Sequence, residues 1–425
     1  MANYQAPRGT YDCAYEDAFR MEEIVELLKS LARVYGYVPI YTPTFESTTL
    51  FARSAGEDSD IVTKEMYSFT DKSGRDMCLR PELTAGVMRA IVTGKFYATR
   101  DLPLKLYYFG SAFRYERPQA GRYREFRQFG IENVGVNSPY SDAETILFGY
   151  HALKLLGFSD VVLKINSIGD GESRNRYRSA LRDFFADKID AMCPDCHRRL
   201  ELNPLRILDC KVEEDRKIIA EAPKMGDYLN EKSKEYFQSV LNILDAEGLA
   251  YEVDASLVRG LDYYSHVVFE FHSRDENGKN LGAIGAGGHY DHLLREVGGP
   301  ELSSVGLAFG IERLNLLKKD DASSSGLDLY VIAMNETNIG AAFSLIQHLR
   351  LNGFRAEMSF ERKSLSSALK VALRKNARFA LIIGETEMQN GSVQVKNLST
   401  HDQAEVRIDD LVGYLDGEIE KEQEE

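Results

Sequence analysis

In the N-terminal part of the chain, apolar residues first recur at helical spacing, and the pattern then becomes that of an extended segment. Seven positions recur every three or four residues: Met21, Ile24, Val25, Leu28, Leu31, Ala32 and Tyr35. This spacing predicts a helix with one buried face, and Gly36 is placed to end it. The next stretch, V-P-I-Y-T-P-T-F, carries two prolines. Because proline cannot donate to a β-ladder, we expect an edge strand or an extended arm there.

Two longer patterns follow. Residues from about 104 to 136 form two aromatic, β-rich runs around the polar stretch R-P-Q-A-G-R, which predicts a long hairpin. From about 170 to 250 the pattern changes to charged amphipathic helices, as in Y-F-Q-S-V-L-N-I-L. We interpret this segment as a helical insertion between two halves of a sheet-based core, with strand character returning at Tyr251.

A polar, small-residue segment, K-K-D-D-A-S-S-S-G, divides the chain near residue 320. We therefore expect one domain over residues 1–320, including the insertion, and a second over residues 327–425. In the second, the runs L-D-L-Y-V-I-A-M, R-A-E-M and R-F-A-L-I-I-G alternate with helical patterns. This order predicts a small α/β domain with a mostly parallel sheet. The acidic end, E-I-E-K-E-Q-E-E, indicates a solvated helix end or tail.

Composition narrows the class of protein. The 425 residues are 44% hydrophobic and 28% charged, which excludes a disordered chain and favours two or three domains. The net charge of −14 disfavours non-specific nucleic-acid binding but leaves room for local basic patches. The N-terminus lacks a signal-peptide core, no apolar run is long enough to span a bilayer, and five cysteines suggest reduced thiols. We expect a cytoplasmic protein with no membrane partner.

The hairpin concentrates chemically useful side chains. Because strand side chains alternate between faces, its two strands place one polar and aromatic set on a common surface: Arg114, Glu116, Arg124, Phe126, Gln128 and Glu132. Arginines can hold phosphates, a phenyl ring can stack on a base, and carboxylates can receive an ammonium group. The set fits a nucleotide together with a small zwitterion. The alternative is a solvated face with cross-strand ion pairs, which the aromatic ring and the amide within the charged row disfavour.

Three further segments carry candidate residues. The stretch L-V-R-G-L-D-Y-Y places Arg259 beside Tyr263 and Tyr264 at the mouth of an apolar strand. A guanidinium there is costly to bury without an anion, which predicts an anionic ligand. The stretches L-R-P-E-L-T-A-G, with Glu82, and G-L-A-F-G-I-E-R-L, with Arg313, are each also typical of a helix start or of surface residues.

Together these segments resemble the signature of class II aminoacyl-tRNA synthetases. Y-G-Y-V-P-I-Y-T-P-T-F, with Pro43, resembles the first motif, F-R-Y-E-R-P-Q-A-G-R-Y-R-E-F the second, and G-L-A-F-G-I-E-R-L the third. Within the class, R-G-L-D-Y-Y and R-P-Q-A-G-R-Y-R-E-F-R-Q are similar to the bacterial type of histidyl-tRNA synthetase. The resemblance spans nearly the whole chain. It implies an α+β fold: an antiparallel-sheet catalytic domain with a helical insertion, plus a C-terminal α/β anticodon-binding domain.

The resemblance also implies an activity. A member of this family activates L-histidine with ATP to histidyl adenylate and pyrophosphate, then transfers histidine to the 3′ end of tRNA(His). Such an enzyme is a homodimer that pairs through the first motif. ATP would bring Mg²⁺ with its phosphates, and no protein ligand of that ion is implied.

Individual roles follow from the resemblance alone. The catalytic residues implied are Arg259 and Arg114. The histidine site implied comprises Glu82, Leu83, Thr84, Arg114, Gln128, Glu132, Arg259, Tyr263, Tyr264 and Tyr290. The ATP site implied comprises Arg114, Glu116, Arg122, Phe126 and Arg313. Arg117 and Gln119 match the positions that read the additional 5′ guanosine of this tRNA.

One segment departs from the family. Near G-A-G-G-H-Y-D-H-L the family has G-G-R-Y-D-G-L, so His289 and His292 stand where arginine and glycine are usual. These replacements bear on the hydrogen bonding around Tyr290, and we expect activity to persist.

Two alternatives remain open. Cys193 and Cys196 form a C-P-D-C pair, His197 adjoins it, and Cys210 follows. Free thiols in the helical insertion are the favoured interpretation, and a structural zinc site is the alternative. For function, the alternative is a catalytically inactive, synthetase-like regulatory subunit of histidine biosynthesis. The retained arginines and the full C-terminal domain favour the ligase.

Overall fold

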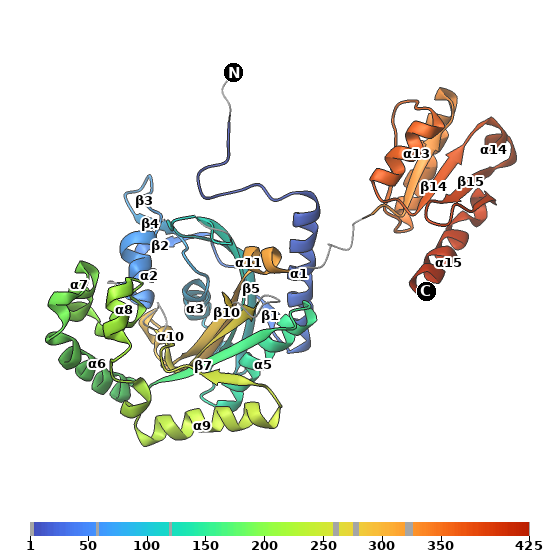
Figure 1. The fold of residues 1–425 in the computed structure, drawn as a ribbon. Helices are drawn as coiled ribbons and strands as arrows, with labels where there is room; N and C mark the ends of the chain where they lie inside the picture. Colours follow the sequence, from blue (N-terminus) through green and yellow to red (C-terminus); the bar gives the residue numbers. More distant parts are fainter. Residues whose placement is uncertain are drawn as a thin grey trace. The chain divides into compact units, whose positions relative to one another are not determined.

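The computed structural model describes residues 4–56, 59–118, 121–257, 263–274, 280–318 and 326–424. The chain divides into two compact units, Met1–Lys319 and Asp320–Glu425. Within these ranges the first unit is built on an eight-stranded sheet (Figure 1). Its strands, in spatial order, are β1 (Val38–Pro39), β5 (Leu104–Phe113), β6 (Glu125–Val134), β11 (Ser304–Gly310), β10 (Asn280–Tyr290), β9 (Ser265–Arg274), β7 (Val161–Gly169) and β8 (Tyr251–Val253). The interior pairs are antiparallel, and the pairs at the two edges, β1–β5 and β7–β8, are parallel.

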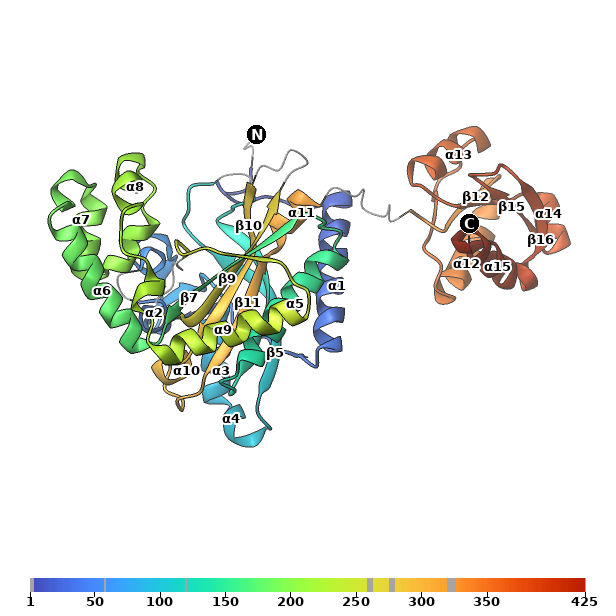
Figure 2. The ribbon, with the colours of Figure 1, turned by 60° about the horizontal axis from the view of Figure 1, so that its bottom comes forward.

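The two faces of this sheet carry separate apolar cores because side chains alternate along each strand. On β9, for example, Val267 and Phe269 pack in one core and Val268 in the other. Helices α1 (Tyr15–Val34), α5 (Pro139–Leu155) and α9 (Glu231–Ala246) cover the first face, as Figure 2 shows for α5 and α9. The shorter helices α3 (Thr84–Thr93) and α10 (Leu293–Glu296) pack on the second.

The patterns at the N-terminus and in the hairpin predicted their elements correctly. Helix α1 buries Met21, Ile24, Val25, Leu28, Leu31 and Ala32. Gly36 follows with φ +80°, a left-handed conformation that glycine adopts without strain. Strand β1 is an edge strand, and β5 and β6 form the long hairpin with Leu104 opposite Val134. One detail was wrong: Arg124 precedes β6, and its guanidinium lies 3.8 Å from the ring centre of Tyr115.

Smaller elements complete the first unit. They are the sheet β2 (Phe45–Ser47), β4 (Asp76–Leu79) and β3 (Ser68–Thr70), the helices α2 (Thr48–Ala55), α4 (Phe96–Thr99) and α11 (Ile311–Leu317), and the π-helical turn η1 (Ile61–Glu65).

The helical insertion between β7 and β8 forms a small core of its own. Before α9 it contains α6 (Gly171–Ala186), η2 (Ile189–Ala191), α7 (Pro194–Leu202), η3 (Pro204–Asp209), α8 (Glu213–Ile219) and η4 (Met225–Tyr228). Figures 1 and 2 both show α6, α7 and α8 side by side, away from the large sheet. Helix α9 differs, because its buried residues Val240, Leu241 and Leu244 pack in the core of the large sheet.

The second unit is a five-stranded sheet with helices, formed by residues within 326–424. The strand order is β13 (Ala356–Met358), β12 (Leu329–Ala333), β14 (Phe379–Ile383), β15 (Ser392–Asn397) and β16 (Gln403–Arg407). The helical elements are η5 (Glu336–Asn338), α12 (Ile339–Leu351), α13 (Leu365–Arg374), α14 (Glu385–Asn390), η6 (Ile408–Asp410) and α15 (Leu411–Glu424). The first three strands are parallel as predicted, but β15 and β16 are antiparallel.

The two units confirm the predicted α+β fold class. Among the described residues, no helix combines the length and the apolar character that a bilayer span requires.

Candidate active site

A pocket of about 300 Å³ opens beside the strands β6, β10 and β11 of the large sheet. Twelve residues singled out in the sequence line it: Glu82, Thr84, Arg114, Glu116, Arg122, Phe126, Gln128, Glu132, Tyr263, Tyr264, Tyr290 and Arg313. They come from five separate stretches of chain. The fold therefore gathers into one cavity the acidic, aromatic and basic groups that the sequence places far apart.

One part of the pocket is acidic and buried. The carboxyl group of Glu132, 1% exposed, accepts hydrogen bonds from the hydroxyl of Thr84 at 2.8 Å and from the hydroxyl of Tyr290. Glu82, 4% exposed, accepts from the backbone N–H groups of Thr84 (2.6 Å) and Ala85 (2.9 Å) at the start of α3. Burial raises the pKa of both carboxyl groups, that of Glu132 well above its usual range. A cationic or N–H-bearing ligand would stabilise their charged forms.

Glycine allows this acidic part to close around Glu132. A Cβ atom at Gly306 on β11 would overlap the Glu132 carboxylate and lie 2.6 Å from the hydroxyl oxygen of Tyr290. Elsewhere in the same pocket, the side-chain oxygen Oε1 of Gln128 is buried, and no described residue donates a hydrogen bond to it. A buried acceptor without a donor is costly, so this oxygen is suited to a ligand N–H group.

Another part of the pocket is basic and aromatic. The guanidinium groups of Arg114 and Arg122 each lie 3.9 Å from the carboxylate of Glu116. Arg114 also donates to the backbone carbonyl of Pro81 at 2.8 Å, which fixes its position, and its guanidinium carbon lies 5.3 Å from the ring centre of Phe126. Burial, and then the positive charge of Arg122, lower the pKa of Arg313. Several guanidinium groups around one aromatic ring form a site suited to phosphates and a planar base.

Comparison with known proteins shows the family to which the chain belongs. Residues 9–314 match the family model for histidyl-tRNA synthetase, and residues 328–418 match that for an anticodon binding domain. The histidine–tRNA ligase of Anoxybacillus flavithermus is 44% identical over 417 residues, covering 97% of this chain and 99% of that protein. The chain belongs to the histidyl-tRNA synthetase family. It is accordingly an ATP-dependent ligase of the aminoacyl-tRNA synthetase class.

Solved structures agree with this assignment. The apo S. aureus histidyl-tRNA synthetase superposes with a TM-score of 0.82 at 37% identity, covering 97% of this chain and all of that one. A Bacillus halodurans chain described as an ATP phosphoribosyltransferase regulatory subunit/histidyl-tRNA synthetase has a TM-score of 0.60 at 21% identity, covering 90% and 98% of the two chains. That likeness shows the fold alone, so the regulatory alternative is the less supported.

The position at which this chain departs from the histidyl-tRNA synthetase family holds a buried cation. His289, 0% exposed, places Nδ1 2.9 Å from a carboxylate oxygen of Asp142 and Nε2 3.0 Å from one of Asp291. Because both ring nitrogens face carboxylate acceptors, both must carry a proton. Burial alone would lower the pKa of His289, but Asp142 and Asp291 raise it from 6.5 to about 10. The imidazolium thus places a positive charge at a position where the family resemblance implies an arginine. His292 lies outside the pocket, 3.1 Å from Glu301.

Two of the remaining predicted residues, Leu83 and Arg117, do not line the pocket. Leu83 is buried in the apolar core beside α3, and Arg117 is exposed. Arg259 and Gln119 lie outside the described residues. The sequence reasoning missed Tyr108, whose hydroxyl lies 3.4 Å from that of Thr84 and which lines the pocket. The sequence did carry a signal for it, since Tyr108 shares one face of β5 with Leu104 and Leu106, and Leu106 is paired with Glu132.

Proposed function

We propose that this pocket binds L-histidine in its acidic part and ATP, as the magnesium complex, in its basic part. The enzyme then forms histidyl adenylate and pyrophosphate, and transfers histidine to the 3′ end of tRNA(His). The observation that carries the proposal is the joint presence, in one cavity, of two buried carboxyl groups and a cluster of guanidinium groups. Neither half alone would favour an amino acid and a nucleotide over other ligands.

In the acidic part, we assign the two ends of histidine to different groups. Glu82, Thr84 and Gln128 would hold the α-ammonium group, since Gln128 offers a buried acceptor and Glu82 a buried carboxyl group. Glu132 and Tyr264, with Tyr263 and Tyr290 beside them, would bind the two imidazole nitrogens. An analogue without those nitrogens would leave buried polar groups unpaired, which such sites reject by about 10⁴-fold.

In the basic part, Arg122 would hold the outer phosphates, Phe126 and Arg313 would stack on the two faces of adenine, and Glu116 would accept from its amino group. A carboxylate oxygen of histidine attacks the α-phosphorus, and the bond to the bridging oxygen of the leaving pyrophosphate breaks. Arg114 would neutralise the charge that builds up there. Arg259 would do the same from the other side, an assignment that rests on family resemblance.

The wider assignments belong to the same proposal. Arg117 and Gln119 would read the 5′ guanosine of the tRNA, and the second unit would bind the anticodon arm. We propose a homodimer formed around the first motif, where Val38, Tyr41 and Phe45 expose 55%, 80% and 56% of their surface. Exposed apolar groups on an edge strand are typical of an interface. The reaction would take place in the cytoplasm, where charged tRNA is used.

Calorimetric titration with L-histidine tests the assignment of the acidic part. The wild-type chain should bind histidine, and thienylalanine, which lacks both ring nitrogens, should not bind measurably. Glu132→Gln should weaken histidine binding at least about 50-fold, because it disrupts a buried, hydrogen-bonded carboxyl group. The exposed Glu252→Gln on β8 is the matched control and should bind as wild type does. Equal binding of thienylalanine, or unchanged binding by Glu132→Gln, would contradict the assignment.

A further inference from the structure

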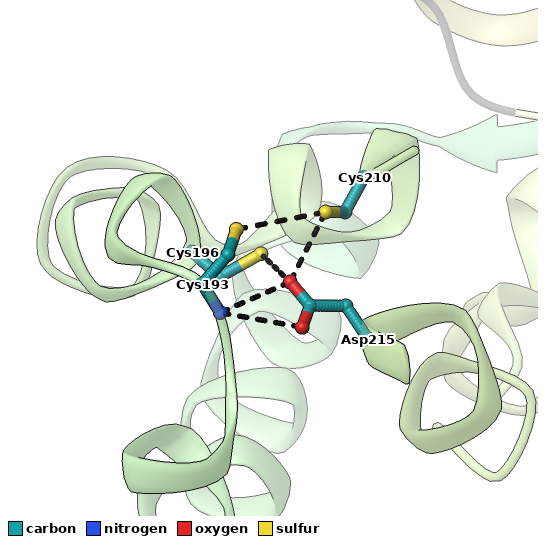
Figure 3. A group of neighbouring side chains, drawn as sticks. All are labelled: Cys193, Cys196, Cys210 and Asp215. Atoms are coloured by element: carbon teal, nitrogen blue, oxygen red, sulfur yellow. Dashed lines mark hydrogen bonds between the residues drawn. The ribbon is translucent and has the colours of Figure 1, made fainter. Parts of the chain in front are cut away.

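Three cysteine side chains and one carboxylate converge inside the helical insertion, away from the pocket (Figure 3). Cys193 is the N-cap of α7 and Cys196 lies in its first turn. Cys210 follows η3, and Asp215 lies in the first turn of α8. Figure 3 shows the three sulfur atoms and the carboxylate turned toward a common centre. Three separate backbone segments therefore supply four potential metal ligands.

The distances match those of a metal coordination sphere. The sulfur atoms of Cys193 and Cys210 are 3.8 Å apart, and a carboxylate oxygen of Asp215 lies 3.2 Å from the sulfur of Cys196 and 3.1 Å from that of Cys210. The four ligand atoms all lie within 4.8 Å of one another. Tetrahedral zinc with bonds of about 2.3 Å to sulfur separates two sulfur ligands by about 3.8 Å. Small side-chain adjustments would be enough to complete such a site.

The environment of Asp215 also favours a cation. This carboxylate is 1% exposed, and no basic side chain among the described residues lies within ion-pair distance of it. Its partners are the sulfur atoms of Cys196 and Cys210 and the backbone N–H of Cys193, at 3.2 Å from both carboxylate oxygens. A buried carboxylate with only weak neutral donors is costly, and a divalent cation would remove that cost.

Without α9, which packs in the core of the large sheet, the insertion comprises only the elements from Gly171 to Tyr228, too few residues to rely on their own apolar core. Its core, separate from that of the large sheet, is formed by Tyr177, Leu181, Phe185, Met192, Cys196, Ile207, Cys210, Met225 and Leu229. Units below about 70 residues commonly need a disulfide or a metal to stabilise them. Two of the nine members, Cys196 and Cys210, belong to the ligand group itself. A bound ion at this place would cross-link α7, the end of η3 and α8.

We propose that Cys193, Cys196, Cys210 and Asp215 bind one zinc ion that holds the helical insertion together. Three thiolates with a carboxylate form a sulfur-rich, four-coordinate set of the kind that zinc prefers. His197, which adjoins the cysteine pair in the sequence, is exposed and lies outside the group. The fourth ligand comes instead from a carboxylate that no cysteine spacing would reveal.

The zinc site is connected to the pocket through a short chain of contacts. Arg199 of α7 forms an ion pair with Asp60 at 3.1 Å, immediately before η1. The carbonyl of Glu65 at the end of η1 accepts a hydrogen bond from the backbone N–H of Tyr115 at 2.7 Å, and Tyr115 follows Arg114 in the chain. Loss of zinc would therefore loosen the support of the second motif without removing a group that touches substrate.

Metal analysis of the full-length chain tests this proposal. The chain is expressed with zinc supplementation and purified under reducing conditions, and its zinc content is measured by mass spectrometry. We expect about one zinc per chain, less than about a third of that in Cys196→Ser, and weakened retention against a chelator in Asp215→Asn. Cys13→Ser, at a partly buried cysteine outside the group, is the control and should retain the wild-type zinc content.

Cobalt substitution covers the case in which a serine variant fails to fold. Cobalt(II) added to the metal-free wild-type chain should give the intense visible bands of a tetrahedral thiolate site, and zinc should displace them. Zinc well below one tenth per chain, both as purified and after reconstitution, would overturn the proposal. The proposal would also be overturned if the purified chain contained a Cys193–Cys210 disulfide and still took up no zinc after that disulfide was reduced.

Discussion

The charge on His289 gives the most specific prediction of the account. Its imidazolium lies between Asp142 and Asp291, and all three side chains are largely buried. We consider two substitutions. His289→Gln removes the positive charge but keeps a polar side chain, and His289→Arg restores the residue usual in the family. Removing one partner of a buried ion pair typically costs about 3–5 kcal/mol, because the Asp142 carboxylate loses its counter-charge.

The pKa of His289 predicts how this contribution depends on pH. The folded pKa of about 10 lies above the unfolded value of 6.5, so the stabilisation is fully present below pH 6.5 and is lost as pH rises toward 10. At about 1.4 kcal/mol per pH unit, the difference corresponds to an upper limit of about 5 kcal/mol, of which about 3 kcal/mol is lost by pH 8.5. For a unit of this size, that loss lowers the melting temperature by about 5 °C.

Thermal unfolding between pH 6 and pH 10 measures this effect. The melting temperature of the wild-type chain should fall toward that of His289→Gln as pH rises, so that the difference between the two narrows. His289→Arg should keep its advantage over His289→Gln throughout, since guanidinium does not titrate in this range. A difference in melting temperature between wild type and His289→Gln that stays constant across the range would show that His289 is neutral in the folded chain.

Three further predictions concern the pocket and the interface. Gly306→Ala should raise the KM for histidine more than tenfold in steady-state kinetics, because the added methyl group overlaps Glu132. The KM for ATP should stay within threefold of the wild-type value. Equal changes in both constants would contradict this assignment. Phe126→Leu should raise the KM for ATP about tenfold, since stacking on a base contributes about 1–3 kcal/mol, and unchanged ATP kinetics would exclude the stacking role. Tyr41→Asp should shift the mass in analytical ultracentrifugation from dimer to monomer, and a wild-type chain already monomeric at micromolar concentration would rule out the proposed dimer.

Elements with a strong hydrophobic period could be predicted from the sequence. The alternation in the hairpin placed Phe126, Gln128 and Glu132 on one face because strand geometry allows no other arrangement. The same alternation predicted the wrong position for Arg124, because this residue precedes β6 and side chains need not alternate between faces outside a strand. Strands β15 and β16 were missed for a related reason. Their sequences, S-V-Q-V-K-N and Q-A-E-V-R, are short and polar, and the sheet supplies the partner that makes them strands.

Features created by tertiary contacts could not be predicted. Asp215 lies 19 residues from Cys196 in the sequence, and only the packing of α8 against α7 brings its carboxylate to the thiols. The charge of His289 likewise depends on Asp142, 147 residues away. In both cases the residue type was visible in the sequence, but the partner that gives it a role was not.

Histidine-dependent exchange of labelled pyrophosphate into ATP reports formation of histidyl adenylate without tRNA, which is the step that the pocket is proposed to catalyse. We predict exchange that requires L-histidine, with a kcat lowered about 10²- to 10³-fold in Arg114→Ala, the usual consequence of removing one charge-stabilising group. A folded wild-type chain that shows no histidine-dependent exchange, or an Arg114→Ala variant that exchanges at the wild-type rate, would contradict the account.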